Sequence, residues 1–239
     1  MKTRTKLLIA APILLLVGAA ALWQVSKSRT FQFFGLIFPR VNTPEKVVAL
    51  TFDDGPTPNA TSEILKVLDE MKVKATFFVI GAELERNMSE GRKIVAAGHE
   101  LGNHSYSHVR MLLVTPGFVQ QEIEQTDRLI RETGYSGEIN FRPPFGKKLL
   151  ALPFYLSKNG RKTIMWDVEP DSNPEVARDA TKIIEVTRSQ VRPGSIILLH
   201  AMYPSRQGSL KAVGGMIESL RREGYRFVTI SELLQAAAD

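Results

Sequence analysis

The stretch Thr51-Phe52-Asp53-Asp54-Gly55-Pro56 is the most informative part of this chain of 239 residues. Residues 47–52 form an apolar run with the β-branched and aromatic content of a buried strand. Two carboxylates and a Gly-Pro break end that run. Neighbouring strand residues point to opposite faces, so Asp53 and Asp54 can serve one site only just past the strand end, where active sites of parallel α/β folds lie. Alone, however, the hexapeptide also has the composition of an ordinary turn.

Strand-like and helix-like segments alternate along the remainder of the chain. Strands are expected at residues 47–52, 75–80, up to 142, 162–168, 195–200 and 225–230. Helices are expected at residues 61–71, 83–97, 118–132, 149–158, 174–190, 209–222 and from 231 onward, with Thr61 and Ser231 as caps. This order implies a single domain built on a parallel sheet with right-handed crossovers.

The basic excess of the chain is confined to its first forty residues. The whole chain holds 31 Lys and Arg against 25 Asp and Glu. Six of the basic residues and none of the acidic ones precede residue 41, which leaves 25 of each sign in the remainder. The pI near 9.5 therefore reflects the leader, and a nucleic-acid partner has no electrostatic support.

The leader resembles an export signal. Residues 7–25 are uncharged and lie between basic residues, and as a helix they would span about 28 Å, close to the roughly 30 Å hydrocarbon core of a membrane. We interpret residues 1–27 as a signal anchor or signal peptide, with membrane contact through residues 7–25 and the catalytic domain outside the cytoplasm. Cleavage at Ala19-Ala20-Ala21 would instead give a secreted or periplasmic protein. Residues 28–44 are expected to be a connector whose aromatic cluster packs on the domain.

The spacing of two histidines suggests a metal site. If a helical turn begins at His104, then His104 and His108 project from one face. Together with Asp54 they form a set of two histidines and one carboxylate, which leaves a coordination position open, as in catalytic sites. Zn²⁺ suits these ligands best, although Co, Ni, Fe or Mn accept the same set. Asp53, beside the ion but not on it, is then the natural general base. His99 has no matching partner and is interpreted as structural.

Four ordered motifs resemble those of the polysaccharide deacetylase family (NodB homology, carbohydrate esterase family 4). They are Thr-Phe-Asp-Asp-Gly-Pro at 51–56, His-Ser-Tyr-Ser-His at 104–108, Arg-Pro-Pro-Phe-Gly at 142–146 and Leu-Leu-His at 198–200. The resemblance covers residues 45–234. It implies an α/β fold, a deformed, incomplete (β/α) barrel of about seven strands occupying residues 45–236, and metal-dependent removal of acetyl groups from N-acetylated sugars.

The resemblance also implies roles for individual residues. Asp53 is similar to the family's base, and Asp54, His104 and His108 are similar to its metal ligands. Arg142 resembles the arginine that orients the base. The backbone N–H of Phe145, at a position that is usually Tyr, would face the oxyanion. His200 resembles the general acid.

The fourth motif departs from the family pattern. The family usually shows Asp-x-x-Asp-Trp, whereas this chain has Trp166-Asp-Val-Glu-Pro-Asp-Ser-Asn173. In register, Glu169 replaces the first Asp and Ser172 the second. The carboxylate that tunes His200 is therefore left open between Asp171, one residue away, and Asp167 at the strand end.

We therefore expect an extracytoplasmic, metal-dependent hydrolase that removes N-acetyl groups from glycans containing N-acetylglucosamine. Peptidoglycan, chitin oligomers and exopolysaccharide are the candidate substrates. One alternative is an O-acetyl esterase on a polysaccharide, since the same site serves both reactions. The other is a glycan-binding module that has lost catalysis, against which the presence of every metal and base residue argues.

Overall fold

Strand β2 (Val47–Asp53) lies at the centre of the parallel sheet. The computed structural model describes the backbone of residues 2–236 and the side chains of residues 14–203 and 205–236. The strands that accompany β2 are β1 (Ile37–Phe38), β3 (Thr76–Val79), β4 (Glu100–Asn103), β5 (Thr163–Ile164), β6 (Ile196–Leu199) and β7 (Arg226–Val228). The helices are α1 (Lys2–Lys27), α2 (Pro58–Glu70), α3 (Gly81–Arg86), α4 (Met88–Ala96), α5 (Pro116–Glu132), α6 (Ala151–Lys158), α7 (Ala180–Gln190), α8 (Gln207–Arg222) and α9 (Ile230–Gln235). Short 3₁₀ turns lie at η1 (Pro144–Gly146), η2 (Pro170–Ser172) and η3 (Pro204–Arg206).

The strands follow the curve of a barrel that is only partly closed. β3, β6 and β7 all pair with β2 in parallel, β4 pairs with β3, and β1 pairs with β5. Isolated bridges from Asn103 to Phe141, from Phe141 to Thr163 and from Val168 to Ile197 continue the ring from β4 to β5 and from residue 168 to β6. The fold is therefore the deformed, incomplete (β/α) barrel that the sequence predicts.

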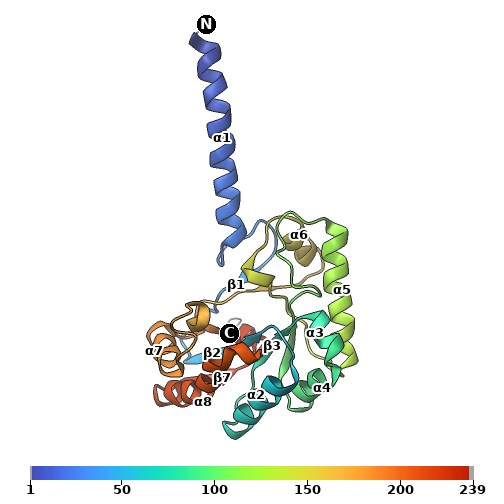
Figure 1. Ribbon diagram of the computed structural model, residues 1–239, viewed down its shortest axis with the longest axis vertical. Coiled ribbons are helices and arrows are strands. Elements are labelled where there is room, and N and C mark those ends of the chain that lie inside the picture. The colour runs from blue at the N-terminus through green and yellow to red at the C-terminus, as the bar shows by residue number, and fades with distance from the viewer. Residues whose placement is uncertain (1, 237–239) are drawn as a thin grey trace.

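The helices form a layer around the outside of the strands (Figure 1). α8 packs on α7 and α2, α2 packs on α4, α3 packs on α4 and α5, and α5 packs on α6. Val48, Leu50 and Phe52 of β2 lie in the same buried cluster as Ile64 of α2 and Val213 of α8. This layer buries the outward face of the central strand.

The alternate residues of β2 face the barrel interior. Val47 and Ala49 belong to a second buried cluster that includes Phe78 and Trp166. Residues two apart on a strand share a face, so Asp53 at the strand's carboxyl end also faces the interior. The strand thus delivers one carboxylate to the mouth of the barrel.

Residues 28–44 are part of the folded body rather than a linker. Strand β1 pairs with β5, and Arg40 Nη1 donates to the carbonyl oxygen of Pro193 at 3.2 Å. The rings of Phe34 and Phe154 meet edge to face with centroids 5.5 Å apart. The connector therefore supplies a strand and aromatic contacts to the domain.

Helix α1 stands away from this body (Figure 1). Its described apolar side chains as far as Trp23, which include Leu14, Leu15 and Leu16, are exposed. Among the described residues, no helix is long and apolar enough to cross a membrane. Of the span expected at residues 7–25, the side chains of residues 7–13 lie outside the described ones, as do those of the basic residues before them.

Several helices begin at other residues than expected, and the last, α9, is capped by Thr229 rather than by Ser231. α2 begins at Pro58 with Thr57 as its N-cap, not at Thr61, because proline is favoured in the first turn of a helix. α7 begins at Ala180 rather than at residue 174. Its N-cap is Asp179, whose side chain accepts from the backbone N–H groups of Thr181 and Lys182.

Two further elements are interrupted. The helix expected over residues 83–97 is divided into α3 and α4 at Asn87, whose amide nitrogen donates to the carbonyl oxygens of Pro56 at 3.0 Å and Glu83 at 3.1 Å. The strand expected up to Arg142 is reduced to bridges at Phe141. The break at Asn87 and the isolated bridges at Phe141 are therefore the two places where a continuous element was expected and is not formed.

Candidate active site

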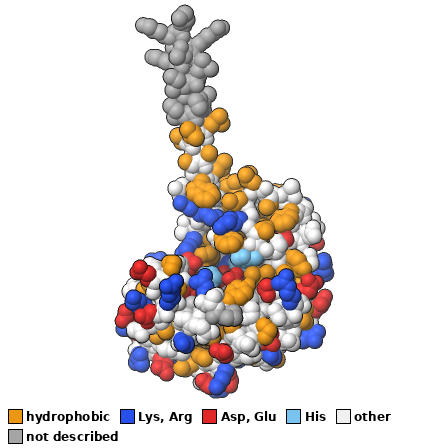
Figure 2. Space-filling model, in the orientation of Figure 1, with side chains coloured by type: hydrophobic (Ala, Val, Ile, Leu, Met, Phe, Trp, Pro, Cys, Tyr) orange, Lys and Arg blue, Asp and Glu red, His pale blue; other side chains and the backbone are white. Residues whose placement is uncertain are grey.

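A cavity of about 390 Å³ opens at the carboxyl end of β2. Figure 2 shows histidine side chains in a hollow of the body below the base of α1, with Lys and Arg side chains above them. The cavity is lined by Arg29, Asp53, Asp54, His104, His108, Phe145, Trp166, Glu169, Asp171, Ser172, His200 and Arg206. Every predicted site residue except Arg142, which lies behind Asp53, and Asp167 borders this cavity.

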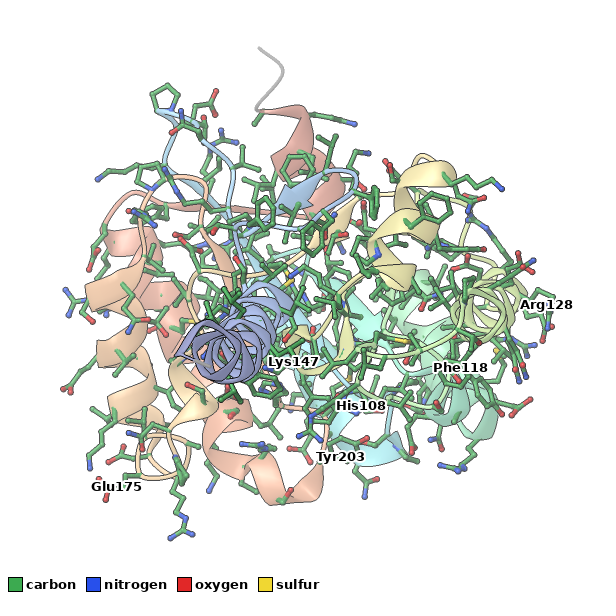
Figure 3. The ribbon with its side chains drawn as sticks, turned by 90° about the horizontal axis from the view of Figure 1, so that it is seen from above. His108, Phe118, Arg128, Lys147, Glu175 and Tyr203 are labelled. Carbon is green, nitrogen blue, oxygen red and sulfur yellow. The ribbon has the colours of Figure 1, made fainter. Side chains whose placement is uncertain are left out.

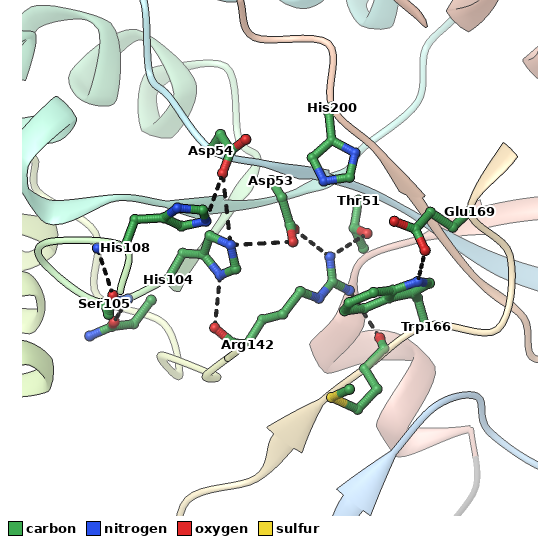
Figure 4. A network of polar contacts seen from close by, with 12 residues as sticks. Thr51, Asp53, Asp54, His104, Ser105, His108, Arg142, Trp166, Glu169 and His200 are labelled. Carbon is green, nitrogen blue, oxygen red and sulfur yellow. Dashed lines mark hydrogen bonds and ion pairs between the residues drawn. The ribbon is translucent and has the colours of Figure 1, made fainter. Parts of the chain in front are cut away.

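Asp53 is held from behind by a buried arginine. Arg142 Nη1 lies 2.5 Å from Asp53 Oδ1 and donates to Thr51 Oγ1 at 2.8 Å, while its Nη2 donates to the carbonyl oxygen of Met165 at 3.1 Å (Figure 4). The other oxygen, Asp53 Oδ2, lies 3.6 Å from His104 Nε2. The arginine therefore orients the carboxylate and leaves one oxygen free on the cavity side.

Asp54 reaches the same cavity through an unusual backbone conformation. Asp53 is the last residue of β2, so only Asp54 lies past the strand end. Its φ of 69° is in the left-handed region, which turns a side chain that would otherwise point away from Asp53's face. Asp54 Oδ1 consequently lies 3.2 Å from His108 Nε2 and 3.8 Å from His104 Nε2.

These three residues fit a divalent metal ion. Their ligand atoms lie within 4.8 Å of one another. Asp54 Oδ1 is buried and has no hydrogen-bond partner among the described residues. His108 Nε2 is near it but does not form a hydrogen bond with it. His104 Nδ1 lies 2.8 Å from the carbonyl oxygen of Arg142, which can only accept, so the proton is on Nδ1 and the Nε2 lone pair faces Asp54. Burial lowers the pKa of His104 and of His108, which favours the neutral form that binds metals.

The two histidines come together on a loop and not on a helical turn. Ser105 and His108 have φ values of 63° and 55°, which no helix contains. Asn103 Oδ1 accepts from the Ser105 N–H at 2.8 Å, and its Nδ2 donates to Asp127 Oδ1 at 2.7 Å. This bent backbone places the rings of His104 and His108 with their centroids 4.9 Å apart.

A buried glutamate of α5 pins the same loop. Glu122 Oε2 accepts from the backbone N–H of Tyr106 at 3.1 Å and of Ser107 at 2.8 Å, and Oε1 accepts from Ser107 Oγ at 2.8 Å. Sequence reasoning missed this residue. The available signal was a carboxylate on the apolar face of an amphipathic helix, next to the buried Ile123.

His200 is held by Asp171. The Asp171 Oδ2 atom accepts from the His200 backbone N–H at 2.8 Å and from Ser209 Oγ at 2.7 Å, and Oδ1 lies 3.2 Å from His200 Nδ1. Burial alone would lower the pKa of His200. The hydrogen bond and charge of Asp171, together with the charges of Asp53 and Asp54, outweigh the effect of burial, and the pKa is raised to about 9. The imidazolium that results is a proton donor at the cavity wall.

The other candidate carboxylate, Asp167, does not contact His200. It accepts from Ser195 Oγ and from the Ile196 backbone N–H, each at 2.9 Å, and so braces the start of β6. Of the two residues that the sequence left open, Asp171 is the one placed against the histidine.

Phe145 borders the cavity from η1. Its backbone is in the left-handed region, with φ 57° and ψ 14°. Its half-exposed ring lies 4.6 Å from the His108 ring, centroid to centroid, and Arg110 lies over it at 4.4 Å.

The altered fourth motif forms a contact that the sequence did not predict. Glu169 Oε2 accepts from Trp166 Nε1 at 2.7 Å (Figure 4) and lies 2.6 Å from Arg29 Nη2. The Arg29 guanidinium lies over the Trp166 ring, 4.5 Å from its centroid. Arg29 precedes the expected catalytic domain, so nothing in the sequence pattern linked it to the site.

His99 lies outside the cavity, in agreement with a structural role. Its Nδ1 accepts from the Ala75 backbone N–H at 3.2 Å, and its ring packs edge-on against Phe77 at 5.4 Å. Burial lowers its pKa to about 4, so the ring is neutral.

Known proteins match both the sequence and this fold. The sequence model of the polysaccharide deacetylase family matches residues 40–164, a stretch that includes the Asp53–Asp54 pair, both cavity histidines of the loop and Arg142. The chain belongs to the polysaccharide deacetylase family. This family assignment makes polysaccharide deacetylation, a hydrolysis, the reaction class of the site.

Individual polysaccharide deacetylases resemble the chain over most of its length. It is 31% identical over 201 residues to a peptidoglycan-N-acetylglucosamine deacetylase of Bacillus cereus, covering 84% of this chain and 94% of that protein. It is 32% identical over 200 residues to a chitooligosaccharide deacetylase of Bradyrhizobium sp., covering 78% and 90%. Among solved structures it resembles a family 4 acetyl xylan esterase from Clostridium thermocellum in complex with a cobalt ion, with a TM-score of 0.73, 33% identity and coverage of 80% and 91%. Because these relatives are named for different glycans, the family determines the reaction class and not the polymer.

Proposed function

We propose that this protein is a metal-dependent hydrolase that removes N-acetyl groups from glycans containing N-acetylglucosamine. One observation carries the proposal. A single cavity brings together a carboxylate fixed by a buried arginine, a three-ligand cluster with an unpartnered buried oxygen, and a histidine of raised pKa. These are a base, a metal site and an acid, which are the groups that amide hydrolysis requires.

Asp54, His104 and His108 would hold the ion, with Zn²⁺ as the best fit and Co, Ni, Fe or Mn as ions that the same ligands accept. When bound, a divalent ion lowers the pKa of water towards about 7 and polarises the acetamide carbonyl. Asp53 accepts the proton of the attacking water on Oδ2, because Oδ1 is engaged by Arg142.

The remaining residues complete the reaction. The Phe145 backbone N–H donates to the developing oxyanion, a contact that contributes about 3–4 kcal/mol in related sites. His200 carries its donor on Nε2, because Nδ1 faces Asp171, and it protonates the leaving nitrogen as the C–N bond breaks. Water is consumed, and acetate and a glucosamine unit are released.

The decisive experiment is acetate release from a panel of glycans with and without a chelator. We expect release from an N-acetylated glycan that a chelator abolishes and added Zn²⁺ restores. Release from acetyl xylan alone would establish the O-acetyl esterase alternative. The similarity to the structure of an acetyl xylan esterase is the observation that favours this alternative. No release from any glycan by the metal-loaded protein would establish an inactive glycan-binding module.

We also propose that residues 7–25 anchor the protein in the cell membrane with the catalytic domain outside the cytoplasm. The exposed leucines of α1 and the uncharged run that contains them support this location. Fractionation of cells followed by N-terminal sequencing tests it. An anchored protein stays with the membranes and keeps its leader, whereas a secreted or periplasmic protein would begin near residue 22.

A further inference from the structure

The last turn of α1 and the segment that follows it are fixed against the loop after η1. The Lys148 backbone N–H donates to the carbonyl oxygen of Ser26 at 3.0 Å, and Lys148 Nζ donates to the carbonyl oxygen of Ser28. Ser26 is 2% exposed and Lys148 is 1% exposed. Lys147 lies over the Trp23 ring at 4.3 Å, and Figure 3 shows Lys147 beside α1. The backbone that leads into Arg29 is therefore an ordered part of the catalytic domain.

Arg29 extends from this segment into the wall of the cavity. Its guanidinium pairs with Glu169 at 2.6 Å and covers the Trp166 ring. Among the described residues, Glu169 is its only hydrogen-bond acceptor, and 40% of the side chain is exposed. A guanidinium has five N–H donors in a planar fork, so Glu169 leaves most of them unused on a side chain that lines the cavity. At this wall of the cavity a glycan would therefore meet the Arg29 guanidinium and not the uncovered ring of Trp166.

The charges around the cavity leave Arg29 able to bind an anion. Asp53 is paired with Arg142 and Asp171 with His200, Asp54 belongs to the metal cluster, and Glu169 engages Arg29 through one oxygen. Arg206 also lines the cavity and forms no ion pair with any described residue. With a divalent ion bound, cationic groups outnumber carboxylates, so an acidic substituent is favoured at this wall.

We propose that Arg29 is a specificity-determining residue that binds a carboxylate of the glycan near the sugar that is deacetylated. A carboxylate matches the planar fork of arginine, which favours a bidentate contact. The inference rests on the proposed deacetylase function and deepens it. It assigns the site to a glycan that carries acidic substituents, such as lactyl, uronic acid or peptide carboxylates, rather than to a neutral chitin oligomer.

The test compares one glycan fragment in two forms, with its carboxylate free and with that carboxylate converted to an amide. The Arg29→Ala variant should raise KM for the free acid by roughly tenfold to a hundredfold, the range of a charge-assisted hydrogen bond. KM for the amidated form should change by less than about twofold, and kcat should change little for either. Arg128→Ala is the matched control, since Arg128 is exposed on α5 away from Lys147 and His108 in Figure 3, and it should leave both KM values unchanged.

Two further measurements separate the explanations. Arg29→Gln keeps hydrogen-bond donors but lacks the charge, so it should reproduce the loss for the free acid. If both variants raise KM equally for the two forms, Arg29 only supports Glu169 and the inference is overturned. Dissociation constants of the two forms are read in parallel by calorimetry. If the wild-type protein releases no acetate, the proposed function fails. The subsite is still supported if the wild-type protein binds the free acid more tightly than the amide and Arg29→Ala abolishes that preference. Equal affinities of the wild-type protein for the two forms overturn it.

Discussion

The Asp171 carboxylate holds His200 at two points, at the backbone N–H and at ring Nδ1. Asp171 is buried, and Ser209 Oγ donates to it as well, so its position is fixed and its charge is weakly screened. A buried carboxylate at this distance stabilises the protonated imidazole. The pH range in which His200 can act as an acid therefore depends chiefly on this contact, to which Asp53 and Asp54 add.

Replacing Asp171 by Asn should move the alkaline limb of the kcat profile to lower pH. His200 has a pKa raised to about 9, so its proton is present below that pH and is lost as the pH rises through it. Without the Asp171 charge, burial lowers this pKa. Above the new pKa, kcat should fall roughly tenfold for each pH unit. A kcat profile between about pH 6 and pH 10 measures the shift.

Asp167→Asn is the matched control for this prediction. Asp167 bonds to Ser195 and to the Ile196 backbone, so its replacement affects β6 but not the acid. Its alkaline limb should stay where the wild-type limb lies. An unmoved limb in Asp171→Asn would show that Asp171 does not set the pKa of the catalytic acid.

The fourth motif shows where sequence reasoning ends. A fixed register pairs the motif's second Asp with Ser172, whereas the structure puts Asp171 against His200. The chain reaches this contact with one residue fewer, through the 3₁₀ turn η2 that begins at Pro170. The other motifs keep their spacing, so their residues were predicted one by one. A shift of one residue can be located only from the contacts across the cavity.

The two adjacent carboxylates should separate into a base and a ligand. Asp53→Asn should retain the metal and lower kcat by about 10²–10⁴-fold, because the variant lacks a general base while the ligand cluster is unchanged. Asp54→Asn should lose metal and activity together, since a neutral amide is a poorer ligand. Metal content by mass spectrometry and kcat on the same preparations give the answer.

The reverse pattern is equally clear. Metal lost from Asp53→Asn and retained in Asp54→Asn would exchange the two roles. Near-normal turnover in Asp53→Asn would exclude it as the base.

The closeness of the candidate metal ligands was predictable from spacing, but the contacts that support their loop were not. The four-residue spacing predicted that the side chains of His104 and His108 lie close together. They do, but on a loop with left-handed residues rather than on a helix. Short-range spacing indicates closeness, whereas conformation depends on partners distant in sequence. Glu122, which holds that loop, is such a partner.

Replacing Glu122 by Gln should weaken metal binding. Oε2 accepts two backbone N–H groups of the loop, and glutamine offers them a neutral oxygen in place of a charged one and replaces Oε1 by an NH2 group, so these bonds weaken and the loop becomes less rigid. Loss of such supporting bonds typically lowers metal affinity by about 10–100-fold. Zn²⁺ titration against a competing chelator measures it. Glu124→Gln, an exposed change on the same helix, should leave the affinity unchanged, and an equal effect in both variants would contradict the role of Glu122.

The fold class followed from the order of elements, but the extent of the domain did not. β1 is two residues long and has no periodicity to recognise, and its pairing with β5 joins segments more than a hundred residues apart. The carbonyl oxygens of Ser26 and Ser28 are a second example. They contribute to the domain only because Lys148, far along the chain, donates hydrogen bonds to them. Short elements of this kind are stabilised by tertiary contacts, which a local pattern does not encode.

A chain that starts at Arg40 should be less stable than one that starts at Trp23. The shorter chain lacks β1 and both carbonyl oxygens that accept from Lys148. Burial lowers the pKa of Lys148 to about 8, and without an acceptor its ammonium group is left unpaired, at a cost of about 1–3 kcal/mol. Each kcal/mol corresponds to a Tm shift of roughly 2–4 °C for a domain of this size. Thermal unfolding of the two chains measures the difference.

The Lys148→Met substitution identifies the cause. In the chain that starts at Trp23 it removes a satisfied hydrogen bond, so Tm should fall. In the chain that starts at Arg40 it removes a buried, unpaired ammonium and supplies apolar volume, so Tm should rise. Opposite signs in the two chains would mean that the segment before Arg40 is a working part of the domain because it pairs with Lys148. Two results would contradict this prediction: equal Tm values for the two unsubstituted chains, or the same sign of the Lys148→Met effect in both. Either would show that the segment before Arg40 is only a linker.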